Sequence, residues 1–155
     1  MSTQRTISIL LDTDQEAKKQ LSELQDAYHS ACNQIVPEVI ASRCWNRVAL
    51  HRLVYIKMRS VSPLGSQMIC NAIFSVCKAY KAKAILPKEE VPKIVFHKGK
   101  SVHFDKRTYC IKGESISLYT LNKRIKVRMK WGPHQKAYFS RGVPKEGELI
   151  CKKGK

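Results

Sequence analysis

The chain has 155 residues, and its 29 lysine and arginine side chains outnumber 12 aspartate and glutamate side chains, for a formal net charge of +17. With 43% hydrophobic residues, 7 glycines and 6 prolines, the composition excludes a disordered polybasic tail and a collagen-like fibre. No apolar run approaches the roughly 18 residues of a membrane span, so we expect a cytoplasmic protein with no membrane partner.

The positive charge is unevenly distributed along the chain. Residues 42–155 carry 26 basic and 6 acidic side chains, a net charge of +20, whereas residues 1–41 carry 3 basic and 6 acidic side chains, a net charge of −3. An excess of one sign repels itself unless a polyanion neutralises it. Nucleic acid is therefore the leading class of partner.

The N-terminal segment predicts a strand that leads into a long helix. Residues 5–11 alternate and then run apolar, as a half-buried strand does. Thr13 and Glu16 have the spacing of a capping box, which predicts that a helix begins there. Apolar residues then recur at steps of three and four up to Val39, and Pro37 should kink this helix or end it within a turn.

Two further amphipathic helices are expected. Asn46 is a good cap for the first of them, whose expected apolar positions are Val48, Ala49, Leu53, Val54 and Ile56. Its polar face is wholly basic and consists of Arg47, His51, Arg52, Lys57 and Arg59. Ser62 and Pro63 predict the start of another helix, which continues to about Lys83. Three amphipathic helices predict a small bundle.

From residue 88 onward the pattern is typical of β structure. Residues 88–92 predict a linker, and residues 98–100 predict the turn of a hairpin. The expected strands lie at residues 93–97, 101–105, 108–111, 115–121, 124–131 and 148–151. Their spacing of roughly ten residues predicts a small antiparallel barrel or sandwich. The last strand has no returning partner, so the chain is either a fragment or completes its sheet with a partner.

The sharpest local pattern is a row of four cations. Period two places the apolar residues of segment 124–131 on one face of a strand, and Arg124, Lys126, Arg128 and Lys130 on the other. This row extends about 20 Å, long enough to follow several phosphates of one strand. The alternative is a solvated face whose lysines protect a sheet edge. Tyr109 and Tyr119 lie in neighbouring strands and are candidates for base stacking or for ordinary cross-strand packing.

The six cysteines are expected to be reduced and mostly buried. They occur without a Cys-x-x-Cys pair, and nothing in the sequence indicates secretion. A metal site formed by His97, His103 and Cys110 is an alternative that their irregular spacing disfavours. We therefore expect no cofactor in this chain.

The order of predicted elements, together with two segments, resembles a known family. The segments are DKRTYCIKG at residues 105–113 and ISLYTLNKRIKV at residues 116–127. Along essentially its whole length the chain resembles the N-terminal half of the TnpB (OrfB) proteins, which are transposon-encoded, RNA-guided DNA nucleases of prokaryotes related to compact type V CRISPR effectors. One departure is the turn at Asn122-Lys123 instead of Asp-Gly, which requires either a positive φ at Lys123 or a longer loop.

This resemblance implies an α+β fold of two parts. Residues 1–11 and 87–155 resemble the wedge domain, an oligonucleotide-binding-like antiparallel β-barrel, and residues 12–86 resemble the inserted three-helix recognition domain. In the family these parts bind the guide RNA scaffold and read a short motif in the double-stranded DNA target. Ser66, Gln67, Asn71 and Lys112 match regions that approach that motif, and glutamine and asparagine can pair with adenine in a major groove. The predicted nucleic-acid-binding set is Arg47, His51, Arg52, Ser66, Gln67, Asn71, Arg107, Lys112, Lys123, Arg124, Lys126, Arg128 and Lys130.

The same resemblance implies that the chain is not an enzyme by itself. The family's RuvC-like nuclease domain and zinc ribbon would follow the last strand, so Mg²⁺ and Zn²⁺ are expected only in that half, which a separate polypeptide is able to supply. Two alternatives stay open. One is a stand-alone RNA- or DNA-binding module acting as a repressor or RNA chaperone. The other is a small metal-dependent nuclease that uses Asp12, although the capping box also explains this residue.

Overall fold

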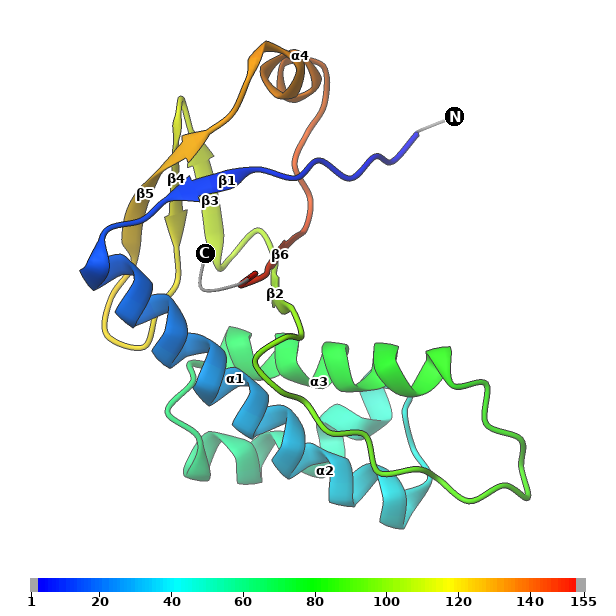
Figure 1. The fold of residues 1–155 in the computed structure, drawn as a ribbon. Helices are drawn as coiled ribbons and strands as arrows, with labels where there is room; N and C mark the ends of the chain where they lie inside the picture. Colours follow the sequence, from blue (N-terminus) through cyan, green and yellow to red (C-terminus); the bar gives the residue numbers. More distant parts are fainter. Residues whose placement is uncertain (1–2, 153–155) are drawn as a thin grey trace.

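A computed structural model describes residues 3–152 of the chain (Figure 1). In this part of the chain the helices are α1 (Gln15–Ser42), α2 (Arg47–Val61), α3 (Ser66–Ala82) and α4 (Pro133–Arg141). The strands in the same residues are β1 (Leu10–Asp12), β2 (Val102–Phe104), β3 (Tyr109–Lys112), β4 (Ser115–Leu118), β5 (Ile125–Lys130) and β6 (Gly147–Leu149). The fold is mixed α+β with antiparallel strands, as predicted. Within residues 3–152, none of the helices combines the length and the apolar character needed to span a membrane.

The strands form an open sheet and a separate ribbon. The four-stranded sheet has the order β1-β5-β4-β3, and every neighbouring pair is antiparallel. The ribbon pairs β2 with β6. The predicted barrel is therefore not closed in the described part of the chain, because β1 and β3 remain the two edges of the sheet. Helices α1 to α3 lie between β1 and β3 in the sequence and gather at one end of the molecule in Figure 1.

The helix boundaries follow local capping chemistry. Asp14, one residue after the predicted cap Thr13, caps α1 because its carboxylate accepts a hydrogen bond from the Ala17 N–H at 2.7 Å. This helix continues past Pro37 and ends at Arg43, which adopts a left-handed φ of 52°. Asn46 caps α2 as predicted, since its side chain accepts hydrogen bonds from two N–H groups of the first turn.

The third helix begins later than predicted. The Ser62 hydroxyl accepts a hydrogen bond from the Leu64 N–H within a turn, and Gly65 then occupies the cap position of α3. The Gly65 N–H donates to the Tyr119 hydroxyl at 2.8 Å, and a Cβ at this glycine would meet that oxygen at 3.2 Å. Contact with the β4–β5 loop, and not a serine–proline cap, therefore defines where α3 starts.

One apolar cluster joins the helices to the strands. Helices α1, α2 and α3 pack against one another, and the cluster extends through β2 to β3 and β4. The buried positions of α2 are Leu50, Val54 and Met58, which recur every four residues. Of the predicted apolar positions, Val54 is buried, whereas Val48, Leu53 and Ile56 are exposed, so the prediction is wrong for these three.

The predicted hairpin at residues 93–105 is wrong. The Asn33 side chain accepts from the Phe96 N–H at 2.8 Å and donates to the Phe96 carbonyl at 2.9 Å, so both backbone groups are already paired with α1. Val91, Ile94 and Phe96 are buried, and this segment therefore packs on the helices without forming a strand. Strand β2 pairs with the distant β6 instead.

The two hairpins of the main sheet agree with the sequence to different degrees. Between β3 and β4, Gly113 supplies the positive φ of 58° that a tight turn needs. Between β4 and β5, residues 119–124 form a longer loop, in which the Thr120 hydroxyl donates to the Lys123 carbonyl. Lys123 avoids a positive φ in this way.

Candidate nucleic-acid interface

Strand β5 separates apolar from basic side chains, as its alternation predicts. Val127 and Met129 are buried on the inner face of the sheet, whereas Lys126, Arg128 and Lys130 are exposed on its outer face. We use the term basic face for the exposed outer surface that carries Lys112, Arg124, Lys126, Arg128 and Lys130.

The strand register places small side chains of β4 beside two of these cations, and Asp12 of β1 lies opposite Arg128 on the other side of β5. Lys126 lies opposite Ser117, and Arg128 lies opposite Ser115, so small hydroxyl side chains flank the long cationic ones. Lys112 pairs with the same Ser115 from the other side, which brings it next to the row. The pairing thus widens the cationic row across three strands.

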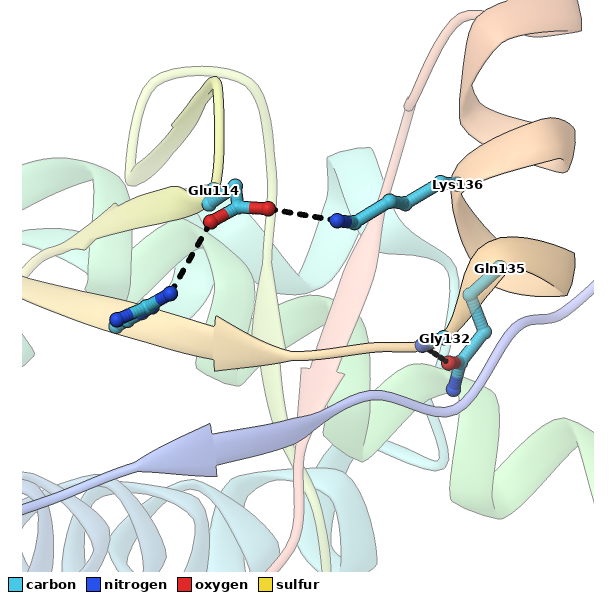
Figure 2. A network of polar contacts seen from close by, with 5 residues as sticks. Glu114, Gly132, Gln135 and Lys136 are labelled. Atoms are coloured by element: carbon cyan, nitrogen blue, oxygen red, sulfur yellow. Dashed lines mark hydrogen bonds and ion pairs between the residues drawn. The ribbon is translucent and has the colours of Figure 1, made fainter.

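Two carboxylates partly neutralise this face. Glu114 lies between two cations, at 3.3 Å from the Arg128 guanidinium and 2.6 Å from the Lys136 ammonium group (Figure 2). The hydrogen bond and the charge of Lys136, followed by the charge of Arg128, lower the pKa of Glu114. The carboxylate of Asp12 is 3.4 Å from the Lys130 ammonium group. All of these groups are well exposed, and exposed ion pairs contribute little to stability, so they exchange readily for pairs with phosphate.

The same groups surround an open hollow of about 330 Å³. Its lining consists of Asp12, Glu114, Arg128, Met129, Lys130, Trp131 and Lys136. Three cations against two carboxylates give the hollow a positive charge, which suits a phosphate group better than a cation.

The basic face continues into the turn between β2 and β3. Arg124 donates from Nε to the Ser117 hydroxyl at 3.0 Å and from Nη1 to the Arg107 carbonyl at 3.2 Å. Arg107 in turn donates from Nη1 to the Gln67 side-chain oxygen at 2.9 Å. A chain of contacts therefore joins the outer face of the sheet to the first turn of α3.

Asp105 organises the polar groups beneath this turn. Its carboxylate accepts hydrogen bonds from Gln67 at 2.8 Å, from the Thr108 hydroxyl at 2.8 Å and from Asn71 at 3.4 Å. The Asn71 amide also donates to the His103 carbonyl. Asn71 is only 1% exposed. Burial therefore leaves Asn71 no open face for the predicted base contact and makes it a packing residue of α3.

The remaining predicted residues lie on α2, at the start of α3 and in the β4–β5 loop. Arg47 places its guanidinium 4.8 Å from the centroid of the Phe74 ring, and His51 stacks on Tyr55 at 4.5 Å. Arg52, Ser66 and Lys123 are exposed. Burial raises the pKa of the Cys70 thiol, while the charges of Arg47 and Arg107 act in the opposite direction.

The two strand tyrosines are not free stacking platforms. Tyr109 is buried, and the Tyr119 hydroxyl is held by the Gly65 N–H in a half-buried position. The metal-site alternative also finds no support in geometry, because His103 is buried whereas Cys110 is exposed. Among residues 3–152, no group of three or more histidine, cysteine, aspartate or glutamate side chains is placed to hold a metal ion.

Sequence reasoning missed α4 and its contribution to this surface. The helix follows Gly132, whose N–H donates to the Gln135 side-chain oxygen at 2.6 Å, and Gln135 also donates to the Ser8 carbonyl (Figure 2). These contacts hold α4 against the segment that precedes β1, and Lys136 of this helix reaches Glu114. The sequence signal for the start of α4 is Pro133 at the first helical position, with Gln135 two residues later.

Comparisons with known proteins identify no relative: neither a protein-family model nor a curated protein matches the chain.

Proposed function

We propose that this chain binds the guide RNA scaffold and the target-adjacent DNA motif of a TnpB-like RNA-guided nuclease. The single observation that carries the proposal is the set of exposed cations on the basic face, which hydrogen bonds of Arg124 and Arg107 connect to the first turn of α3. A surface of this length and sign fits the regular phosphates of a nucleic acid.

Within this proposal, helices α1 to α3 act as the recognition domain and the strands act as the wedge domain. The proposal assigns binding, and no catalytic group, to these residues. Cleavage and its Mg²⁺, together with a structural Zn²⁺, belong to a RuvC-like unit of the same or another polypeptide. The expected partners are therefore guide RNA, double-stranded DNA and that nuclease unit.

A salt series of RNA binding tests the proposal. The RNA transcribed from the 3′ flank of the gene is compared with a scrambled RNA of equal length, each with and without Mg²⁺. The proposal expects a preference of about 100-fold for the native RNA at physiological salt, which corresponds to about 2.7 kcal/mol, and no cleavage by the chain alone. Equal binding of both RNAs, fading together with salt, would favour a non-specific basic module.

The Mg²⁺ samples also test the nuclease alternative. Asp12 would be its catalytic carboxylate, but the nearest charge to it is the Lys130 ammonium group at 3.4 Å. A two-metal site needs several carboxylates around the metals, whereas the Asp12 carboxylate is paired with a lysine. Metal-dependent cleavage that is abolished by Asp12→Ala would favour this alternative over the binding proposal.

A further inference from the structure

The side chain predicted to read bases, Gln67, has its hydrogen-bonding groups engaged within the protein. Its Nε2 donates to Asp105 at 2.8 Å and to Asn71 at 3.3 Å, and its Oε1 accepts from Arg107 at 2.9 Å. The amide orientation is forced, because a carboxylate accepts and a guanidinium donates. Gln67 can pair with adenine only by breaking this network.

This network holds one end of the Arg107 guanidinium at the protein surface. One N–H of its Nη1 is directed to Gln67, whereas Nε and Nη2 have no hydrogen-bond partner in the part of the chain that the structure describes. The side chain is exposed. Hydrogen bonds also fix the backbone at Arg107. Its carbonyl accepts a hydrogen bond from Arg124, and the hydroxyl of the next residue, Thr108, donates to Asp105.

One nitrogen of the Arg107 guanidinium is held by Gln67, and its other N–H groups are free within residues 3–152. A guanidinium in this state can donate two hydrogen bonds at once to a suitable acceptor. The most common such acceptor in sequence-specific DNA recognition is the O6/N7 edge of guanine in the major groove. The fixed turn lowers the conformational entropy that an unconstrained arginine would lose on binding. Arg124, a cation that can contact phosphate, contacts the Arg107 backbone from the sheet, and the exposed Arg47 on α2 lies over the Phe74 ring of α3.

We infer that Arg107 reads a guanine in the major groove of duplex DNA, and that Gln67 and Asp105 position it without contacting the base. This inference rests on the proposed nucleic-acid-binding function and specifies one base of the target. Duplex DNA is favoured over unpaired RNA because splayed RNA bases are usually stacked on aromatic rings. Here Tyr109 is buried, the Phe74 ring carries Arg47, and the Tyr119 hydroxyl is engaged.

Selection from a duplex DNA library with a randomised segment tests the inference. The protein is used as the full chain, with and without its bound RNA, and the base preference at each position is measured by sequencing. Wild-type protein should favour guanine at one position about 10- to 100-fold, the discrimination expected from one bidentate arginine–guanine pair.

Four variants separate base reading from charge. Arg107→Ala should abolish the preference for guanine, and Arg107→Lys should reduce it, because a lysine ammonium group keeps the charge but lacks the planar fork. Gln67→Ala should weaken the preference while leaving the salt dependence unchanged, as expected for a positioning residue. Lys106→Ala removes an exposed cation from the same turn and should keep the preference.

The outcomes are distinct from those of the RNA-binding test. Loss of the guanine preference in Arg107→Ala but not in Lys106→Ala supports the inference. A wild-type protein with no base preference, or a preference that persists in Arg107→Ala, overturns it. If the native RNA is still bound selectively in that case, the inference fails alone; if RNA selectivity is absent too, the proposed function fails with it.

Discussion

The guanidinium of Arg124 donates a hydrogen bond to the backbone carbonyl of Arg107, with Nη1 3.2 Å from the oxygen. Since Nε of Arg124 also holds the Ser117 hydroxyl, this one side chain connects the sheet with the turn that carries Arg107. The basic face and the first turn of α3 thus form one surface through a contact between two arginines.

Replacing this connector should weaken nucleic-acid binding more than it weakens the fold. We expect Arg124→Ala to reduce the slope of log K against log salt by about one, because one phosphate contact is lost. The free energy of unfolding should change by less than about 1 kcal/mol, since the side chain is exposed. Fluorescence anisotropy at several salt concentrations and urea denaturation measure the two effects. An unchanged slope would remove Arg124 from the interface.

Removing the carboxylate between Arg128 and Lys136 should strengthen binding. Glu114→Gln frees both cations for phosphate, and exposed ion pairs are weak, so affinity should rise about 2- to 5-fold at low salt. Glu90→Gln changes the net charge equally at an exposed site in the segment between α3 and β2 and serves as the control. Equal effects of the two substitutions would contradict a local role for Glu114.

Local patterns predicted much of the fold and of the basic surface. The alternation in β5 predicted which side chains face solvent, and the Asn46 cap predicted the start of α2, because each depends only on neighbouring residues. Some failures are local, such as the apolar positions assigned to α2 and the missed helix α4, and others involve distant contacts. Asn33 prevents the segment around Phe96 from forming a strand, although the two residues are 63 positions apart.

Distant contacts also determine the roles of Gln67 and Asn71 at the candidate site. The sequence predicted Gln67 and Asn71 from residue type, but the groups that occupy their amides come from Asp105 and His103, which lie more than 30 positions away. Folding brings Asp105 into contact with α3, where its carboxylate accepts hydrogen bonds from the Gln67 and Asn71 amides. Both amides are therefore engaged within the protein and are not available for bases. The cationic row needed no such distant partner and was therefore predictable.

A buried hydroxyl supports the packing of α1 on α3. The Tyr28 hydroxyl is 2.8 Å from the Asn71 carbonyl and 2.5 Å from the Ser75 hydroxyl, and burial raises its pKa above the usual value. We expect Tyr28→Phe to lower the free energy of unfolding by about 1–2 kcal/mol, because a buried carbonyl loses a donor. Urea denaturation measures this change. Tyr138→Phe, at a half-buried tyrosine of α4, is the control and should cost less; equal costs would contradict the prediction.

The buried His29 should make stability depend on pH. Burial lowers its pKa below 6.5, and this outweighs the carbonyl groups of Lys100 and Ser101 near the ring, which act in the opposite direction. The unfolded chain therefore binds the proton more tightly, so stability falls as the pH drops below about 6.5. His103 has a pKa lowered by burial too and adds to the same trend.

Replacement by leucine isolates the contribution of His29. Neither ring nitrogen has a hydrogen-bond partner among residues 3–152, so His29→Leu loses no such bond and should leave stability at pH 7 nearly unchanged or higher. Between pH 7 and pH 5 the variant should lose less stability than the wild type, as measured by urea denaturation at each pH. The same loss in both proteins would contradict the assigned role.

The most direct test of the nucleic-acid interface compares two double variants in a salt series of RNA binding. Lys112→Ala with Lys126→Ala removes two exposed lysines from the basic face, and Lys18→Ala with Lys19→Ala removes two exposed lysines from α1. The account predicts that the first pair lowers the salt slope by about two and weakens binding, whereas the second pair leaves the slope near the wild-type value. Equal slopes for both pairs would contradict the claim that the outer face of the sheet binds nucleic acid.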